Sequence, residues 1–111
     1  MDSTRQLKIS KLILKELSII FQRKAIDYQN KLISVTVVRI TPDLGYAKVY
    51  LSIFPENNIE EIFEMVKADT YKIRFELGKI IGKQVRRIPE LSFHIDDSLN
   101  YAERINELLE K

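Results

Sequence analysis

Hydrophobic residues first recur at helical spacing over residues 4–23, which predicts an amphipathic N-terminal helix. Ser3 precedes this stretch and is a suitable N-cap, because its hydroxyl can accept a hydrogen bond from a free backbone N–H. The expected inner positions are Leu7, Ile13, Leu14, Leu17, Ile20 and Phe21. The expected solvent side is basic and comprises Arg5, Lys8, Lys11 and Lys15.

Two stretches rich in β-branched and aromatic residues then predict a hairpin. After a short polar stretch, LISVTVVRI (32–40) and YAKVYLSIF (46–54) are the expected strands. Pro42 and Asp43 favour a turn between them, and we expect Gly45 to take the positive φ that such a turn needs. The connection is too short for a crossover, so the two strands are expected to be antiparallel.

Two closely spaced helical patterns follow the hairpin. The first, IEEIFEMVKA, has Asn57 or Asn58 as its cap, and the second runs from Tyr71 to Lys83. We expect a kink at Ala68, Asp69 and Thr70, because Asp and Thr are poor inside helices and good at caps. The expected inner positions of the second helix are Ile73, Leu77, Ile80 and Ile81. Another face aligns the side chains of Lys72, Lys79 and Lys83.

The chain ends with a predicted strand and a predicted helix. ELSFHID (90–96) alternates strictly, which is typical of a half-buried strand. Its expected inner positions are Leu91, Phe93 and Ile95. Asp97 or Ser98 is expected to cap a last helix whose inner positions are Leu99, Ala102, Ile105 and Leu109. The order is helix, strand, strand, helix, helix, strand, helix.

Length and composition favour a single domain spanning residues 1–111. The chain has no cysteine, which excludes disulfides, thiolate catalysis and cysteine-ligated metals. It shows neither a signal-peptide pattern nor an apolar run of membrane-spanning length. We therefore expect a soluble, cytoplasmic protein that has no membrane partner.

Charge is strongly segregated although the formal net charge is only +2. Residues 5–31 carry seven basic and two acidic side chains, and residues 67–87 carry the same numbers. Residues 55–66 have four glutamates and no basic side chain, and residues 88–111 have six acidic and two basic side chains. Segregation of this kind can create a positive face that binds a polyanion, although solvated helix surfaces produce it too.

The stretch RIPELSFHIDDS holds the only histidine, His94, near Asp96 and Asp97. Zinc needs three or four ligands, and no second histidine or cysteine is present to complete a site. No nucleophile-elbow or phosphate-loop motif occurs either. We interpret this stretch as a strand end followed by a helix cap, and we expect no enzyme activity, metal, cofactor or small-molecule substrate.

Several motifs together resemble one family. They are TPDLGYAKVYLSIF at 41–54, IRFELGK at 73–79, the pattern Arg-x-x-Pro-Glu-Leu-x-Phe-x-x-Asp-x-Ser at 86–98, and Arg-Ile-x-x-Leu-Leu at 104–109. In this order and spacing they resemble the ribosome-binding factor A family. The resemblance implies an α+β, type II KH-like domain: a three-stranded sheet with helices on one face, a kinked helix pair before the third strand, and a C-terminal helix.

The resemblance also implies a function. The chain would be a monomeric bacterial assembly factor that binds the free small ribosomal subunit and its rRNA during late maturation. It would act on processing of the 5′ end of that rRNA, and it would matter most in the cold. The family pattern at the kink is Ala-x-Gly, whereas Ala68, Asp69 and Thr70 contain no glycine. Because Asp69 would repel a phosphate, we expect the basic side chains that flank the kink to make the contacts with RNA.

The candidate RNA-binding residues are the basic side chains of two segments, since lysine and arginine neutralise phosphates and release counterions. The main set is Lys67, Lys72, Arg74, Lys79, Lys83, Arg86 and Arg87, with help from Arg5, Lys8 and Lys11. Candidates for stacking on unpaired bases are Tyr46, Tyr50 and Tyr71. We expect the side opposite the RNA to carry Glu60, Glu61 and Glu64.

A different class remains open from the residues alone. The same elements could form a non-ribosomal protein-interaction or homodimerisation module with incidental basic faces. Binding by such a module would depend little on salt, whereas binding to RNA weakens steeply as salt rises.

Overall fold

The computed structural model describes residues 3–96. Its elements are α1 (Thr4–Arg23), the 3-10 helix η1 (Ala25–Tyr28), β1 (Leu32–Ile40), β2 (Tyr46–Phe54), α2 (Ile59–Ala68), α3 (Thr70–Ile81) and β3 (Glu90–Ile95). The first helix and the two hairpin strands have the predicted bounds. The predicted last helix and its cap, Asp97 or Ser98, lie outside the described residues.

The three strands form one sheet in the order β1-β2-β3. β1 and β2 are antiparallel, and a bulge shifts their register between Val35 and Val37. β3 runs parallel to β2, from the pair Tyr46 and Glu90 to the pair Leu51 and Ile95. A parallel neighbour needs a long crossover, which α2 and α3 supply.

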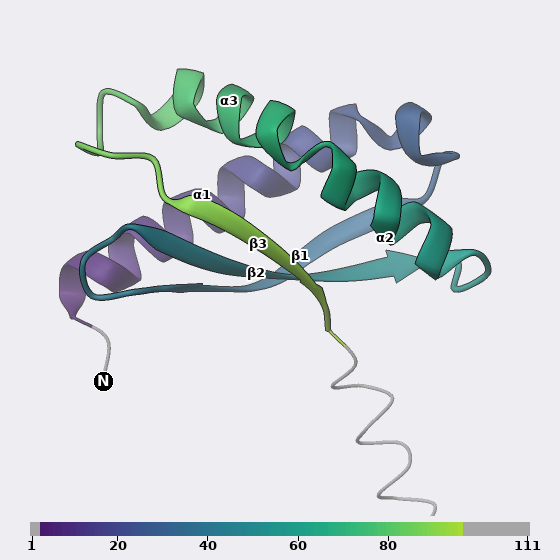
Figure 1. Ribbon diagram of the computed structural model, residues 1–111, viewed down its shortest axis with the longest axis horizontal. Coiled ribbons are helices and arrows are strands. Elements are labelled where there is room, and N and C mark those ends of the chain that lie inside the picture. The colour runs from purple at the N-terminus through teal and green to yellow at the C-terminus, as the bar shows by residue number, and fades with distance from the viewer. Residues whose placement is uncertain (1–2, 97–111) are drawn as a thin grey trace, which may run out of the picture.

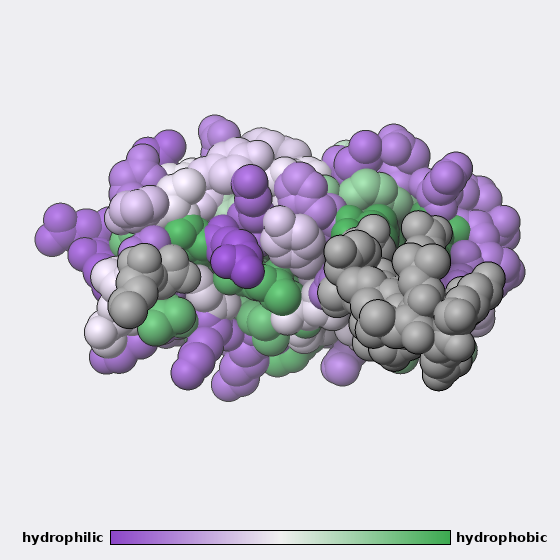
Figure 2. Space-filling view, turned by 90° about the horizontal axis from the view of Figure 1, so that it is seen from below, coloured by the Kyte–Doolittle hydropathy of each residue, from purple (hydrophilic) through white to green (hydrophobic). Residues whose placement is uncertain are grey.

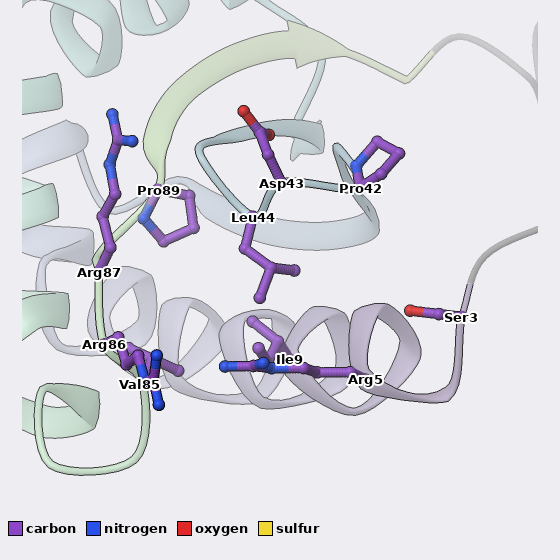
Figure 3. A pocket seen from close by; sticks show the side chains of 10 residues that line it. All are labelled: Ser3, Arg5, Ile9, Pro42, Asp43, Leu44, Val85, Arg86, Arg87 and Pro89. Atoms are coloured by element: carbon purple, nitrogen blue, oxygen red, sulfur yellow. The ribbon is translucent and has the colours of Figure 1, made fainter.

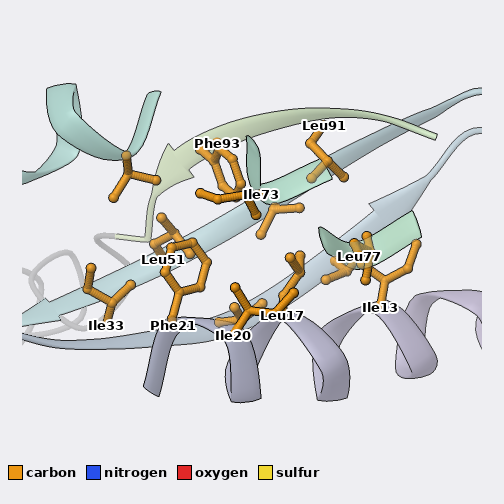
Figure 4. Packing of buried hydrophobic residues seen from close by; sticks show 14 of the residues in the cluster. Ile13, Leu17, Ile20, Phe21, Ile33, Leu51, Ile73, Leu77, Leu91 and Phe93 are labelled. Atoms are coloured by element: carbon orange, nitrogen blue, oxygen red, sulfur yellow. The ribbon is translucent and has the colours of Figure 1, made fainter. Parts of the chain in front are cut away.

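Within residues 3–96, the helices all cover one face of the sheet, and we call the opposite face the open face (Figure 1). α1 contributes Ile13, Leu17 and Ile20 to the core, and their side chains are fully buried. They meet Ile73 and Leu77 of α3 and the inner side chains of the strands (Figure 4). This arrangement confirms the predicted α+β, KH-like fold within the described residues.

Two predicted inner positions are wrong. Leu7 is 49% exposed because the inner face of α1 begins with Gln6 and Ile9 instead. The side-chain amide of Gln6 is buried and donates to the Ile40 carbonyl (2.9 Å), which ties the start of α1 to the end of β1. On α3, Ile80 is 38% exposed, whereas Ile73, Leu77 and Ile81 are buried.

The hairpin turn is also built differently from the prediction. Leu44, and not Gly45, takes the positive φ (61°). Asp43 holds this conformation, because its carboxylate accepts from the Thr41 hydroxyl (2.6 Å) and the Gly45 N–H (3.1 Å). The Gly45 carbonyl then accepts from the Glu90 N–H (3.0 Å), which joins the turn to β3.

The break between α2 and α3 lies at Asp69. The predicted capping role of this residue is wrong, because its side chain makes no capping bond. It accepts instead from the Tyr28 hydroxyl (2.9 Å), which connects the break to η1. The Thr70 hydroxyl donates back to the Lys67 carbonyl (2.7 Å). α3 ends at Ile81, so Lys83 lies in the following turn and not on the helix.

Candidate RNA-binding surface

The solvent side of α3 combines aromatic and basic side chains. Because Ile73, Leu77 and Ile81 are buried, helical geometry turns the opposite side of α3 outward. We name this side the α3 outer face; its residues are Tyr71, Lys72, Phe75, Gly78 and Lys79. Tyr71 is 76% exposed and Phe75 is 57% exposed, which is unusual for large aromatic side chains.

The charge of the α3 outer face is positive. The Lys79 ammonium lies 4.8 Å from the centroid of the Phe75 ring, a cation–π contact that leaves its charge unneutralised. The one acidic residue of α3, Glu76, lies on the flank of the helix and pairs with Lys24 (3.4 Å). The face extends about 12 Å along the helix, and exposed Lys83 follows it in the next turn.

Phe75 was missed from the sequence. A phenylalanine in a helix usually belongs to the core, so the hydrophobicity of Phe75 did not indicate that it is exposed. Its position along the helix did indicate this. Phe75 is two residues from both Ile73 and Leu77, and so it points away from the inner face that these residues define.

The predicted aromatic set divides between two faces of the molecule. Tyr71 lies on the α3 outer face, whereas Tyr46 and Tyr50 lie on the open face of the sheet. Figure 2 shows the molecule from the side of this open face, where hydrophilic and hydrophobic residues are intermixed. The Tyr50 ring contacts His94, with 5.4 Å between ring centroids. These three tyrosines therefore cannot form one stacking platform.

The predicted basic residues also take several different positions. Arg74 has a structural contact that the sequence did not reveal, because its guanidinium donates to the carbonyls of Pro89 (3.0 Å) and Ile88 (2.7 Å). These bonds fix the segment that enters β3. Lys67 lies on α2, where it pairs with Glu64 (3.0 Å) and contacts the Phe63 ring (5.2 Å).

The glutamates of α2 lie in the same helix layer as the basic residues of α3, and their placement on the side opposite the RNA stays a prediction. Glu60, Glu61 and Glu64 are exposed on α2, which covers the same face of the sheet as α3 (Figure 1). The expected separation of charge therefore occurs along the helix layer: acidic on α2 and basic on α3, with the break at Asp69 between them.

Two further basic groups border the same helix layer. Lys8 and Lys11 are exposed on α1, which packs beside α3. Arg5, Arg86 and Arg87 come from distant parts of the sequence and surround a hollow at the start of α1 (Figure 3). Arg86 and Arg87 follow shortly after α3, so this hollow continues the basic surface beyond Lys83.

His94 and its neighbours Ser92 and Asp96 make ordinary structural contacts. The His94 Nε2 atom lies 2.8 Å from the Ser92 hydroxyl, and Asp96 accepts from the Thr36 hydroxyl (2.5 Å). Across residues 3–96, no group of three or more His, Cys, Asp or Glu side chains is arranged to hold a metal ion. Asp97 lies outside the described residues.

The Asp69 carboxylate accepts a hydrogen bond from the Tyr28 hydroxyl. Burial raises the pKa of the Tyr28 hydroxyl well above its usual range, and the hydrogen bond to Asp69 raises it further. The hydroxyl therefore stays a donor at neutral pH, and the negative Asp69 remains at the break. A phosphate directly over the break would meet this charge, so the geometry favours anion binding farther along α3.

Comparison with known proteins agrees with the fold and the motifs. The family profile described as "Ribosome-binding factor A" matches residues 5–109. Ribosome-binding factor A of Cytophaga hutchinsonii is 44% identical, and the alignment covers 100% of this chain and 84% of that protein. The Chlorobaculum tepidum protein of the same name is 43% identical, over 96% of this chain and 89% of that protein.

Two solved structures share the fold at lower identity. The crystal structure of ribosome-binding factor A from Thermus thermophilus has a TM-score of 0.68 and 20% identity, and covers 81% of this chain and 94% of that one. A homology model of the Thermus thermophilus protein, fitted into a cryo-EM map of a 30S–RbfA complex, has a TM-score of 0.58 and 16% identity, over 87% of this chain and 97% of that one. No helix within residues 3–96 is long and apolar enough to cross a membrane. From the full-length profile match and these relatives, the chain belongs to the ribosome-binding factor A family.

Proposed function

We propose that this chain binds the free small ribosomal subunit through its rRNA and assists late maturation in the cytoplasm, including processing of the 5′ end of that rRNA. It acts as a monomer, by binding and not by catalysis. The α3 outer face carries this proposal: two exposed aromatic rings lie among lysines on a helix side that has no acidic residue.

The chemistry of this face suits folded RNA that has unpaired bases. Lys72 and Lys79 would neutralise backbone phosphates and release their counterions. Tyr71 and Phe75 would stack on bases, a contact that suits single-stranded or splayed RNA and requires no particular sequence. Gly78 lies between Phe75 and Lys79 on this face, and the Ile88 side chain fills the space beside its α-carbon.

Family membership supports the choice of partner. The fold is shared with a protein placed in a 30S complex, and relatives over 40% identical carry the ribosome-binding name. A KH domain usually clamps the nucleic-acid backbone with a glycine-rich loop between two helices. Here Asp69 occupies the corresponding break, so we place the main contacts on α3 beyond it.

Sedimentation with purified ribosomal particles tests this proposal. The chain is mixed with free small subunits, large subunits and joined ribosomes at low and high salt, and the bound fraction is measured. We expect co-sedimentation with free small subunits, weakened at high salt, and little with the other particles. Equal binding to all three particles, or to none, would contradict the proposed partner.

The exposure of Tyr71 and Phe75 would also suit binding to a protein. A second experiment must therefore distinguish RNA binding from the alternative function, a protein-interaction or homodimerisation module. Such a module would associate with itself or with a protein, and its binding would change little between the two salt concentrations. Analytical ultracentrifugation of the chain alone separates the homodimer from the monomer that we propose.

A further inference from the structure

A small hollow lies where three segments meet: the start of α1, the turn between β1 and β2, and the segment that enters β3 (Figure 3). Its volume is about 260 Å³. Pockets for drug-sized ligands usually measure about 300–1,000 Å³, so this hollow suits one ring system rather than a larger group. Its apolar wall comes from all three segments, through Ile9, Leu44, Val85 and Pro89.

Each wall of the hollow is held in place by hydrogen bonds. In the capping box of α1, the Ser3 N–H donates to Gln6 Oε1 (2.8 Å) and the Gln6 N–H donates to the Ser3 hydroxyl (3.1 Å). The Asp43 bonds fix the turn that presents Leu44. Arg74 fixes the carbonyls of Ile88 and Pro89. A hollow that is formed before binding loses little entropy when a ligand enters it.

The rim of the hollow is cationic. It carries Arg5, Arg86 and Arg87, and no hydrogen bond or salt bridge joins any of their guanidinium groups to another residue within 3–96. The one acidic residue in the lining, Asp43, is engaged by Thr41 and Gly45 in its own turn, and its carboxylate points away from the hollow (Figure 3). The Arg87 guanidinium lies beside Gly45 and attracts the Asp43 carboxylate, so Arg5 and Arg86 are the groups left to bind an anion.

We propose that this hollow is a subsite for one unpaired RNA nucleotide, whose base lies against Ile9, Leu44 and Val85 and whose phosphate binds Arg5 and Arg86. A bare phosphate would leave the apolar wall without a contact, and an apolar ligand would leave the charges of Arg5 and Arg86 without a partner; a nucleotide matches both. The subsite rests on the proposed RNA binding and extends it, because a strand that follows α3 past Lys79 and Lys83 reaches Arg86 and Arg87 next.

Methyl NMR of the full chain, labelled at Ile, Leu and Val, tests this subsite directly. The probes are a seven-nucleotide oligouridylate and an abasic RNA backbone of the same length. We expect the oligouridylate to shift the Ile9, Leu44 and Val85 methyl signals, and the abasic strand to shift them much less. Leu32, which is exposed on the open face of the sheet, serves as the internal control. Absence of oligouridylate-induced shifts at the three methyl groups would overturn the subsite, whatever the oligonucleotide does elsewhere.

Two variants separate the wall from the rim. Leu44→Gly removes a wall side chain at a positive φ that glycine adopts freely, so the fold should tolerate it. It should reduce any preference for the base-bearing strand at least threefold while leaving affinity for the abasic strand unchanged. Arg5→Gln with Arg86→Gln should weaken both strands together. An unchanged base preference in Leu44→Gly would overturn the subsite.

The remaining outcomes distinguish this inference from the function on which it rests. Chains that bind small subunits but show no base-dependent shift in the hollow would overturn the subsite and leave the proposed function standing. Chains that bind neither oligonucleotide nor small subunits would contradict both. Shifts caused by hexaglutamate but not by RNA would assign the hollow to an acidic protein segment and overturn the nucleotide subsite.

Discussion

At the scale of single residues, several polar side chains have structural contacts that their position in the sequence does not reveal. Gln6, Tyr28 and Lys31 are buried, and each bonds to a residue more than 20 positions away. Lys31 belongs to the basic segment 5–31, whose charged side chains a sequence pattern predicts to be exposed to solvent. Such contacts depend on which segments meet in space, so single-sequence patterns cannot predict them.

Lys31 should contribute to stability rather than to RNA binding. Its ammonium donates to the Asn57 carbonyl (2.6 Å), the Asn57 side-chain oxygen (2.9 Å) and the Pro55 carbonyl (3.2 Å). Lys31→Met keeps the apolar stem and removes these donors, so we expect the free energy of unfolding to fall by about 1–2 kcal/mol. Urea denaturation measures the change. The matched variant Lys15→Met, on the exposed side of α1, should be nearly neutral. Equal effects of the two would contradict this role.

The Tyr28 hydroxyl should make stability depend on pH in the alkaline range. Its pKa is raised in the folded state, so folding favours the protonated form and this contribution is lost as pH rises above the unfolded value near 10. Wild type should be more stable than Tyr28→Phe at pH 8. That difference should shrink by up to about 1.4 kcal/mol per pH unit above pH 10. Urea denaturation of both proteins at pH 8 to 11.5 tests this, and a difference that does not change with pH would refute it.

At the scale of elements, local patterns predicted most of the fold. The periodicity of α1 and the β-branched runs of β1 and β2 gave their bounds correctly. The turn was mistaken at Leu44, because the Asp43 contacts with Thr41 and Gly45 stabilise a left-handed leucine that propensity disfavours. Local sequence patterns do not determine that β3 pairs in parallel with β2, because this pairing depends on how α2 and α3 cross the sheet.

Gly78 weakens α3, and the α3 outer face retains it where alanine would favour the helix. A β-carbon at this position would lie 3.4 Å from Ile88 Cγ1, an ordinary contact. Gly78→Ala should therefore raise the free energy of unfolding by about 0.5–1 kcal/mol, because alanine restricts the unfolded chain and favours the helix. Thermal and urea unfolding measure this change. A loss of stability would show that Ile88 cannot move to accept the methyl group.

At the scale of the whole molecule, the sheet separates two surfaces of different character. The helix layer carries the α3 outer face, the lysines of α1 and the arginines of the hollow, whereas the open face of the sheet carries Tyr46, Tyr50 and His94. Basic segments at 5–31 and 67–87 indicated a positive surface. Which of their residues belong to it follows only from the packing: Lys31 is buried, and Arg74 is engaged at the entry to β3.

The most direct test of the RNA-binding surface compares the same kind of charge loss on the two faces. One variant replaces Lys72 and Lys79 with glutamine. The control replaces Arg39 and Lys48, an exposed cross-strand pair on the open face of the sheet, with glutamine. Affinity for purified small subunits is measured over a range of salt concentrations. We expect the slope of log affinity against log salt to decrease in magnitude by about 2 in the α3 variant and to stay near the wild-type value in the control. Equal changes in the two variants would contradict the account, because they would show that the chain binds through its overall charge and not through the α3 outer face.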